Sequence, residues 1–513
     1  MDNSETDSAA SPRWKLLIAM LAVPVILWLI SAKTGILDSG FNGVLAFLLL
    51  FLLLVVFLVW LLLLGRVPAT GKAGGVVIIA LFAVMFRYDG LTGDFFPRFV
   101  WRWAQKPAIE LPELAGKMAS QDQPLATAGP DYFPRFLGAG MGNWVSGERL
   151  AADWFKSPPK ELWRKEMGEG WSSFSVGGDY AFTMEQRGEK EVLVCYELRT
   201  GNAVWVHSEE VRFEEGMGGD GPRTTPTIAG DRVFSFGATG ILNCHDARSG
   251  EKLWGKNVLV EAGHEVPRWA KSCSPLVVEG KVIVTLGEKA KGVAAYDVTS
   301  GELVWRGAED GSSYASLIHG TLAGQDQIVA MLKRSVKGLS VADGSELWSF
   351  PIGNPQGNCA TPHLIGDRVL TSSGYGYGSH LLEIKQSGGG FAAEELWKSR
   401  DLKAKFADFV VRGEFVYGLS EKDLVCLNLE DGFPEWEGGE YGYGQMLGVG
   451  DHLIVQSERG KVYVLEASPD GEEVVSEFRA LSSKTWNHPV LAGRILLVRN
   501  DREAVAFEYP GKQ

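Results

Sequence analysis

A short pattern that ends in tryptophan recurs along most of the chain and constrains its fold most strongly. Three clear copies are VCYELRTGNAVW, NCHDARSGEKLW and AAYDVTSGELVW. The aromatic positions that close the copies are Trp163, Trp205, Trp254, Trp305, Trp348, Trp397, Trp436 and Phe478. The intervals between these positions average about 45 residues, and a strand-rich repeat of this length predicts the blades of a β-propeller.

Each repeat is predicted to form four short strands. In the second repeat these strands are TPTIAG, RVFSFGA, ILNCHDA and EKLWGK, taken from the centre of the ring outward. Ser249 and Gly250 supply the tight turn before the last strand, because glycine accepts the positive φ that such a turn needs. Inner-strand starts recur eight times between Ser172 and Asn487. We therefore expect an all-β, eight-bladed propeller over residues 161–513.

The two ends of the repeat region complete one another. The last repeat ends after AVAFEYP without an outer strand, whereas KELWRKEM around Trp163 is an outer strand without a blade. Pairing them would remove both open sheet edges. We predict that this N-terminal strand closes the propeller, and that each closing aromatic side chain packs against the turn of the neighbouring blade.

The first 88 residues differ from the rest because they contain three apolar runs. Residues 16–32 and 73–86 carry no charge, and neither does the long stretch Phe41–Gly65. These runs predict a membrane anchor of about three transmembrane helices in residues 1–88. The third run is short, so an interfacial or buried helix is the alternative. Residues 89–160 are interpreted as a juxtamembrane linker and lead-in.

Basic residues indicate how this anchor is oriented. The cations on one side of a three-span arrangement are Arg13, Lys15, Arg66 and Lys72, whereas the intervening short loop carries only Lys33. The positive-inside rule then predicts a cytoplasmic N-terminus and a periplasmic propeller at the inner membrane. If the third run does not cross, this orientation inverts.

Charge and cysteine usage exclude several classes of function. The chain has 50 basic and 63 acidic residues, a net charge of −13, and no basic stripe after residue 110. Nucleic acid is therefore not expected as a partner, because phosphate binding needs a basic face. The five cysteines lie far apart in the sequence and predict buried core positions rather than a disulfide framework. The sequence also shows no metal-ligand spacing among its eight histidines.

The repeat motif also points to a family. The pattern D-x-x-[ST]-G-x-x-x-W in Asp246–Trp254 and Asp297–Trp305 resembles the tryptophan-docking motif of pyrroloquinoline-quinone (PQQ)-like propeller repeats. The lead-in FPRFLGAGMGNWVSGERLAADW resembles the start of bacterial PQQ-binding-like propeller proteins, and Arg87–Trp103 resembles the juxtamembrane linker of their membrane-anchored members. The resemblance covers about residues 130–513. It implies the fold but no particular activity.

Departures from the enzymes of this family are informative. Quinoprotein alcohol dehydrogenases of this fold carry adjacent cysteines over the quinone and a Ca²⁺-binding set of carboxylate and amide groups. This sequence has no Cys-Cys pair, and it lacks the long insertions that build the active-site lid in those enzymes. The membrane-bound glucose dehydrogenases nevertheless share the plan of membrane helices followed by a propeller, which implies PQQ and Ca²⁺ as the cofactors of an enzymatic alternative.

Residues at the entrances of the inner strands form the candidate cofactor-binding site. They are Trp171, Arg223, Trp269, Lys271, Tyr314, Asn358, Lys405, Gln445, Trp486 and Asn487. In a propeller these positions line the central channel and one face, where tryptophans and cations would suit a planar anion such as the quinone tricarboxylate. The alternative is that these side chains hydrogen-bond to water and to neighbouring blades. No catalytic residue and no metal ligand is predicted.

These observations favour one function and leave a second open. We expect a membrane-anchored, noncatalytic PQQ-like propeller that acts as a scaffold and binds proteins or other components of the cell envelope outside the inner membrane. The alternative is a membrane-bound, PQQ-dependent dehydrogenase of sugars or alcohols.

Overall fold

The computed structural model describes most of the chain in a few long segments. These are residues 39–64, 67–93, 96–104, 106–114, 132–145, 158–352, 354 and 356–509, with the isolated positions 18, 22, 25, 26, 125, 128 and 129. The chain forms two compact units: one consists of Met1–Gln105 with Gly216–Gly218, and the other contains the rest of the chain. The first predicted transmembrane run, residues 16–32, lies almost entirely outside the described residues.

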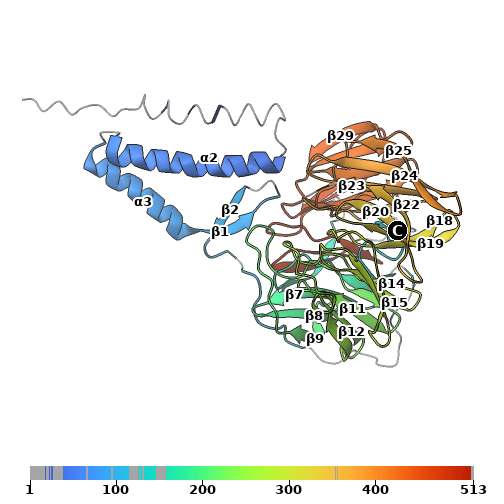
Figure 1. The fold of residues 1–513 in the computed structure, drawn as a ribbon. Helices are drawn as coiled ribbons and strands as arrows, with labels where there is room; N and C mark the ends of the chain where they lie inside the picture. Colours follow the sequence, from blue (N-terminus) through green and yellow to red (C-terminus); the bar gives the residue numbers. More distant parts are fainter. Residues whose placement is uncertain are drawn as a thin grey trace, which may run out of the picture. The chain divides into compact units, whose positions relative to one another are not determined.

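The described part of the N-terminal unit contains two long helices and a hairpin (Figure 1). Its elements are α2 (Ser39–Val59), the π-helical turn η1 (Trp60–Leu64), α3 (Ala69–Met85), β1 (Phe86–Leu91) and β2 (Pro97–Trp101). Within the described part of the chain, no helix has both the length and the apolar character that crossing a membrane requires. The predicted set of about three transmembrane helices is therefore not confirmed.

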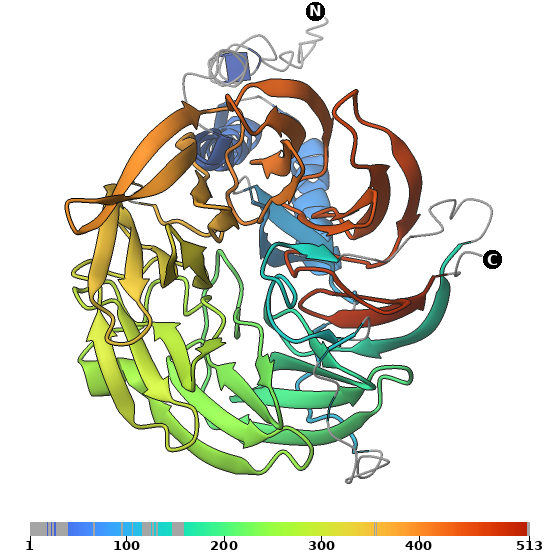
Figure 2. The same cartoon turned by 90° about the vertical axis from the view of Figure 1, so that its right-hand side faces the viewer.

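The second unit is a ring of eight blades, each built on four antiparallel strands, and two of them gain a fifth strand from the lead-in; the ring is seen along its axis in Figure 2. Blade 1 contains β6 (Ser175–Gly177), β7 (Tyr180–Arg187), β8 (Lys190–Glu197) and β9 (Ala203–Glu209). Blade 2 contains β10 (Thr227–Ala229), β11 (Arg232–Phe236), β12 (Ile241–Asp246) and β13 (Lys252–Asn257), and the short helix α4 (Val258–Ala262) follows it. Blade 3 contains β14 (Leu276–Val278), β15 (Lys281–Thr285), β16 (Val293–Asp297) and β17 (Leu303–Gly307). Blade 4 contains β18 (Ile318–Leu322), β19 (Gln325–Met331), β20 (Ser335–Ser340) and β21 (Glu346–Pro351).

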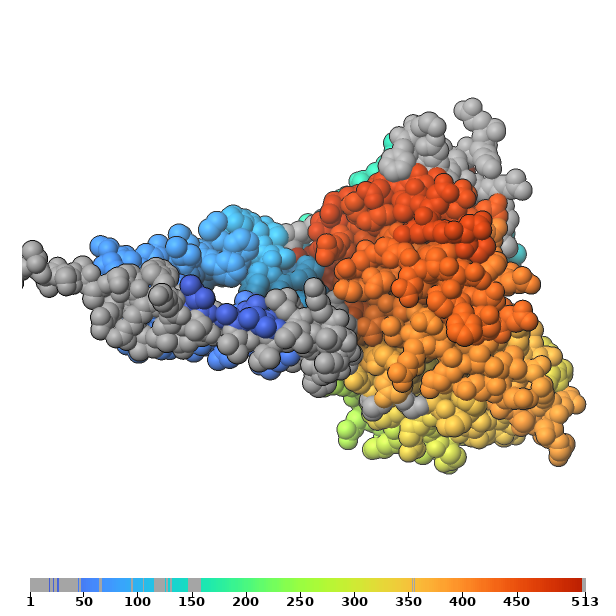
Figure 3. All heavy atoms as spheres, turned by 90° about the horizontal axis from the view of Figure 1, so that it is seen from above, coloured from blue at the N-terminus to red at the C-terminus, as the bar shows by residue number. Residues whose placement is uncertain are grey.

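The later blades repeat this order. Yellow, orange and orange-red segments of the propeller pack side by side in the space-filling view (Figure 3). Blade 5 contains β22 (His363–Ile365), β23 (Arg368–Ser373), β24 (Gly378–Ser387) and β25 (Gly390–Ser399). Blade 6 contains β26 (Val410–Arg412), β27 (Phe415–Ser420), β28 (Asp423–Asn428) and β29 (Pro434–Glu440). Blade 7 contains β30 (Gln445–Val449), β31 (His452–Gln456), β32 (Lys461–Glu466) and β33 (Val474–Arg479). Blade 8 contains β34 (Val490–Ala492), β35 (Ile495–Arg499) and β36 (Glu503–Glu508). Its fourth strand is β5 (Lys160–Glu166), which precedes blade 1 in the sequence.

Strand β5 closes the ring. It pairs antiparallel with β36, and Trp163 lies opposite Ala506. The last blade thus receives its outer strand from residues that precede the first blade, which is the closure that the sequence predicts. The prediction of an eight-bladed propeller is confirmed.

Most of the closing tryptophans connect one blade to the next. The indole N–H of Trp205, for example, donates to the carbonyl of Ala247 at 3.1 Å, and its ring lies against Gly250 in the turn of blade 2. The same donation joins Trp163 to Leu198, Trp254 to Val298, Trp305 to Val341, Trp397 to Leu429 and Trp436 to Ser468. A carbonyl of the next blade therefore receives each of these indole N–H groups, and in every case except Trp436 a glycine of the same turn lies against the ring.

Two blades depart from this arrangement. Trp348 donates instead to Oε1 of Gln327 within its own blade, at 2.6 Å. The strands β24 and β25 of the following blade have ten residues each and meet in the exposed turn at Gly388 and Gly389, where the docking turn of the other blades would be. Phe478 packs edge-on against Phe507 of blade 8, with ring centroids 4.9 Å apart.

The lead-in segment 132–145 adds strands on the axial side of two blades. β3 (Tyr132–Phe133) pairs with the inner strand of blade 1, and β4 (Trp144–Val145) runs parallel to the inner strand of blade 7. Between them, the buried Asn143 side chain donates to the carbonyl of Phe409 at 3.2 Å and shares a 2.7 Å hydrogen bond with His488. This segment therefore ties several blades together at the axis of the ring.

Candidate functional site

The loops that enter the inner strands bring aromatic rings and lysines together. Seven residues form what we call the aromatic–lysine arc: Trp171, Tyr375, Lys405, Phe406, Tyr443, Lys484 and Trp486. They lie in five connections, each of which precedes or joins the strands of a different blade; Lys405 shares its connection with Phe406, and Lys484 shares its connection with Trp486. The ring of Trp486 lies 4.9 Å from that of Trp171 and 5.3 Å from that of Phe406, measured between centroids. Phe406 is in turn 5.4 Å from Tyr443.

The two lysines of the arc lie over these rings. Nζ of Lys405 is 4.5 Å from the ring centroids of both Tyr375 and Tyr443. Nζ of Lys484 is 3.9 Å from the ring centroid of Trp486 and 4.9 Å from that of Trp171. Both lysine side chains are buried, so their ammonium groups gain attraction from ring faces in a site with little water. The arc can therefore present positive charge beside flat apolar surfaces.

Lys484 was not among the predicted site residues. It lies two positions before Trp486, outside the part of the repeat that marks the start of an inner strand. A carboxylate, Glu458, also belongs here, because its Oε1 accepts the indole N–H of Trp486 at 3.0 Å. The sequence signal for Lys484 is a cation two positions from a predicted tryptophan, and cations near tryptophans are too common in this chain for that signal to identify a site residue.

Arg223 forms a separate cluster near the entrance to blade 2. Its guanidinium donates to the carbonyls of Gly221 and Gly219 at 2.7 and 2.6 Å, and it lies 5.0 Å from the ring centroid of Phe213. Burial lowers the pKa of Arg223 to about 10, against an opposing effect of the nearby carboxylates. The guanidinium thus holds the loop that connects blades 1 and 2.

Lys271 is occupied inside the protein. Its ammonium donates to Oγ1 of Thr285 at 2.9 Å, to Oγ of Ser312 at 3.4 Å and to the carbonyl of Leu286. Burial lowers the pKa of Lys271 to about 8. Three acceptors around a fully buried ammonium compensate for its lost hydration, which gives this lysine a structural role between blades 3 and 4.

The predicted amide side chains bridge neighbouring elements. Asn358 donates to the carbonyl of Leu332 at 2.7 Å, and Gln445 donates to the carbonyl of Phe406 at 2.7 Å. Asn487 donates to the carbonyl of Ser172 at 2.7 Å and so joins blade 8 to blade 1.

The last two predicted residues are aromatic and lie near blade 3. Trp269 lies under the guanidinium of Arg268, 4.6 Å from ring centroid to Cζ. The backbone N–H of Tyr314 donates to the carbonyl of Asn358, and burial raises the pKa of the Tyr314 phenol. The structure thus brings three of the ten predicted residues, Trp171, Lys405 and Trp486, into the aromatic–lysine arc. The other seven make local contacts, and their role in cofactor binding stays a prediction.

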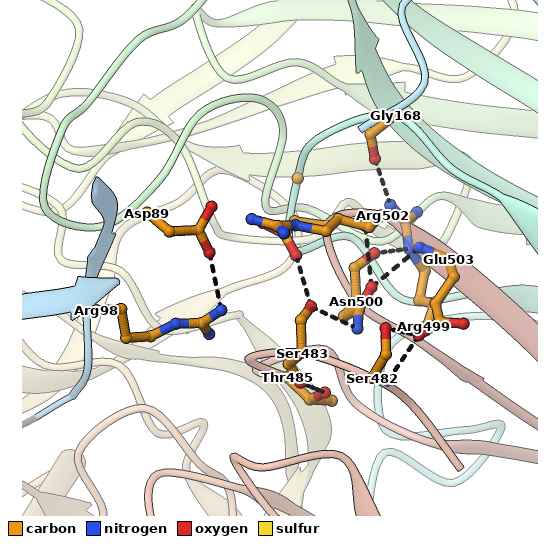
Figure 4. A network of polar contacts seen from close by, with 12 residues as sticks. Asp89, Arg98, Gly168, Ser482, Ser483, Thr485, Arg499, Asn500, Arg502 and Glu503 are labelled. Atoms are coloured by element: carbon orange, nitrogen blue, oxygen red, sulfur yellow. Dashed lines mark hydrogen bonds and ion pairs between the residues drawn. The ribbon is translucent and has the colours of Figure 1, made fainter. Parts of the chain in front are cut away.

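A polar network joins the last blade to the first (Figure 4). The buried guanidinium of Arg499 donates to the carbonyl of Gly168 at 3.3 Å. It also donates to Oγ1 of Thr183 at 2.6 Å. Nearby, Oδ1 of Asn500 accepts the backbone N–H groups of Arg502 and Glu503, at 2.9 and 3.0 Å. The bonds of Arg499 therefore stabilise the junction between the last and the first blade, and those of Asn500 stabilise the turn that follows β35.

No cluster suited to a metal ion is found in the described segments: none of them brings three or more histidine, cysteine, aspartate or glutamate side chains together in a suitable arrangement. The five cysteines form no disulfide, and all except the half-buried Cys359 are buried.

Comparisons with known proteins point to one family and one fold. The family model described as outer membrane protein assembly factor BamB matches residues 159–254 and 188–438. Outer membrane protein assembly factor BamB from Burkholderia pseudomallei (strain K96243) is 28% identical over 192 residues, which make up 36% of this chain and 46% of that protein. The match therefore spans a little under half of the length of that relative.

Two solved structures share the fold. BamB from Moraxella catarrhalis superposes with a TM-score of 0.52 at 16% identity, over 68% of this chain and 100% of that one. The quinohemoprotein alcohol dehydrogenase ADHIIG from Pseudomonas putida HK5 superposes with a TM-score of 0.57 at 13% identity, over 76% of this chain and 83% of that one. One propeller architecture thus occurs in an assembly factor and in an enzyme.

Proposed function

Since this chain belongs to the PQQ-like repeat family described as outer membrane protein assembly factor BamB, we propose that it is a noncatalytic scaffold that binds other proteins of the cell envelope. The relative from Burkholderia pseudomallei carries the name of an assembly factor, which requires contact with other proteins. A rigid ring of eight sheets suits this role because it presents a large surface that changes shape little on binding.

The observation that carries this proposal is a group of exposed apolar side chains on blades 2 and 3. Leu253 of β13 is 45% exposed, Val304 of β17 is 45% exposed, and Val260 of α4 is 73% exposed. The guanidinium of Arg306 on β17 donates to the carbonyl of Glu261 in α4 at 3.3 Å, which places these elements next to one another. Exposed apolar side chains on neighbouring elements are typical of protein-binding surfaces.

The contacts at the strand entrances also support a scaffold. Arg223, Lys271 and Asn487 direct their donors to carbonyl and hydroxyl oxygens of their own or neighbouring blades. These side chains hold the ring together, so a ligand would have to compete with existing hydrogen bonds.

The test is co-purification of the full chain with its partners from cross-linked membranes. We expect the double variant Leu253→Asp/Val304→Asp to lose the partners that the wild-type chain retains, because a buried interface does not tolerate unpaired carboxylates. Leu396→Asp is the matched control: Leu396 precedes Trp397 in blade 5 as Leu253 precedes Trp254 in blade 2, and it is similarly exposed. Equal retention by the wild-type chain and the double variant would contradict the proposal.

The proposed location is the outer, periplasmic side of the inner membrane, with the N-terminus in the cytoplasm. The support comes from the uncharged stretch Phe41–Gly65 and from the basic residues around the apolar runs. Exposed apolar side chains such as Leu48, Phe51 and Leu63 agree with a lipid environment. Protease treatment of spheroplasts tests the orientation, since the propeller should be reached from outside and the N-terminus should not.

The second candidate function is a membrane-bound, PQQ-dependent dehydrogenase of sugars or alcohols, and the aromatic–lysine arc favours it. Lys405 and Lys484 would pair with the carboxylates of the quinone, while the rings of Trp171 and Trp486 supply flat surfaces. When bound, PQQ would accept the two electrons of the oxidised substrate. The fold shared with the Pseudomonas putida enzyme agrees with this alternative.

Incubation of the full chain with PQQ and Ca²⁺ tests this alternative. A quinone absorbance that survives gel filtration, together with dye reduction by sugars or alcohols, would favour the enzyme. The double variant Lys405→Met/Lys484→Met should then lose the absorbance. If the wild-type chain elutes without quinone, the enzymatic alternative is wrong.

A further inference from the structure

The hairpin β1–β2 that follows α3 has two chemically different faces. Its register places Phe86 opposite Trp101 and Tyr88 opposite Phe99. Because residues directly opposite one another in antiparallel strands share a face, these four aromatic side chains lie on one side of the hairpin. Arg87 and Val100 form a pair on the other side.

The aromatic face is open and continuous with α3. Phe99 is 46% exposed, Trp101 is 44% exposed and Trp103, just beyond the hairpin, is 65% exposed. Phe82 of α3 packs on Phe86 with ring centroids 4.9 Å apart and on Phe99 with ring centroids 5.5 Å apart. The aromatic rings therefore extend an apolar helix surface onto the hairpin.

The position of the hairpin relative to α3 is fixed by Arg102. Its guanidinium donates to the carbonyls of Val84 and Ala83, at 2.8 and 2.5 Å, and its backbone N–H donates to the carbonyl of Met85 at 2.8 Å. These carbonyls end the helix, where a cation is favourable. Three hydrogen bonds from one arginine therefore hold the hairpin against the end of the helix.

The other face of the hairpin carries charge. Nη2 of Arg98 pairs with Oδ2 of Asp89 at 2.8 Å (Figure 4), and Nη2 of Arg87 lies 4.0 Å from Oδ1 of the same carboxylate. Across residues 86–104, three arginines outnumber two aspartates. The hairpin thus combines an aromatic face with a small positive excess.

We propose that the hairpin β1–β2 with Trp103 lies in the headgroup region of a phospholipid bilayer, with its aromatic face toward the acyl chains. A two-stranded hairpin in water is only marginally stable, so an exposed aromatic face needs cover. Tryptophan and tyrosine prefer the boundary between headgroups and hydrocarbon, and arginine complements lipid phosphates. The proposal deepens the membrane attachment proposed above and depends on it.

The test uses the full chain reconstituted into vesicles of phosphatidylcholine and phosphatidylglycerol with brominated acyl chains, which quench tryptophan fluorescence on contact. Wild type is compared with Trp101→Phe/Trp103→Phe, so that the difference signal reports on these two indoles. We expect this signal to lose intensity strongly when the bromines lie near the carbonyl end of the acyl chain, and less when they lie near the methyl end. Trp269→Phe, in the propeller, is the matched control and should give an unquenched difference signal.

Three outcomes are distinguishable. Loss of the difference signal with shallow bromines supports the interfacial hairpin. If the protein floats with the vesicles but the signal is unquenched, the hairpin proposal is wrong while membrane attachment stands. If the protein does not float with the vesicles, both proposals fail. Trp103 lies outside the strand pairing, so the single variant Trp103→Phe gives the same comparison without changing the hairpin register.

Discussion

The contact between Trp205 and Gly250 offers a quantitative test of how the blades hold together. The Trp205 side chain is 7% exposed and its indole donates to the carbonyl of Ala247. Removing a buried tryptophan side chain takes about 200 Å² of apolar contact out of the interface, so Trp205→Ala should lower the free energy of unfolding by about 3 to 5 kcal/mol.

Gly250 approaches the same ring from the neighbouring blade. Its φ is +73°, and a Cβ at this position would lie 2.6 Å from Cδ2 of Trp205. Gly250→Ala should therefore combine a left-handed backbone penalty of about 1 kcal/mol with a steric penalty of about 1 to 3 kcal/mol. Gly230 is the matched control, because its φ is +63° and nothing lies within 4 Å of the added Cβ.

A double-mutant cycle isolates the steric part. In the Trp205→Ala background the cavity can accept the new methyl group, so Gly250→Ala should cost only the backbone penalty, giving a coupling energy of about 1 to 3 kcal/mol. Urea unfolding followed by far-UV circular dichroism measures all four proteins, provided that their m-values agree. If the two substitutions simply add, or if Gly250→Ala costs no more than Gly230→Ala, the ring of Trp205 does not dock on this turn.

Three further predictions concern buried polar groups. Burial raises the pKa of Glu191 from 4.5 to about 7, so between these pH values the folded state holds a proton that the unfolded state has lost. The free energy of unfolding should therefore fall by about 2 to 3 kcal/mol as the pH rises from 5 to 8. Urea unfolding of Glu191→Gln should not show this fall. Burial lowers the pKa of His363 from 6.5 to about 3, so as the pH falls below 6.5 the unfolded state takes up a proton that the folded state does not. The free energy of unfolding should therefore fall by about 2 kcal/mol from pH 7 to 5. Calorimetry of His363→Leu should show no such loss. Asn143→Ala should lower stability by about 2 to 4 kcal/mol, because it leaves the buried carbonyl of Phe409 without this donor; an unchanged melting curve would show that the lead-in does not hold the ring.

The sequence is sufficient to predict the ring because the repeat is encoded locally. Each copy ends in a closing aromatic residue, and every copy except the one at Trp163 carries its own turn glycine, so the number of blades follows from counting. The pairing of β5 with β36 also follows, since an unpaired edge at each end of the repeat must be covered.

Other features depend on contacts that no local pattern encodes. The segment 132–145 has no periodicity, so its strands at the axis of the ring could not be anticipated. Trp348 looks like every other closing tryptophan, yet blade 5 offers it no docking turn and it bonds to Gln327 instead. Lys271 and Lys405 both precede inner strands, but only the fold decides that one is enclosed by oxygen acceptors and the other by aromatic rings.

Site-specific photo-cross-linking tests the proposed scaffold function most directly. A photoreactive amino acid replaces Leu253, or Leu396 as the control, in the full chain, and intact cells are irradiated. We predict that the Leu253 position gives a discrete cross-linked product with an envelope protein and that the Leu396 position does not. No product at Leu253, or the same products at both positions, would contradict the proposal that this propeller binds its partners through blades 2 and 3.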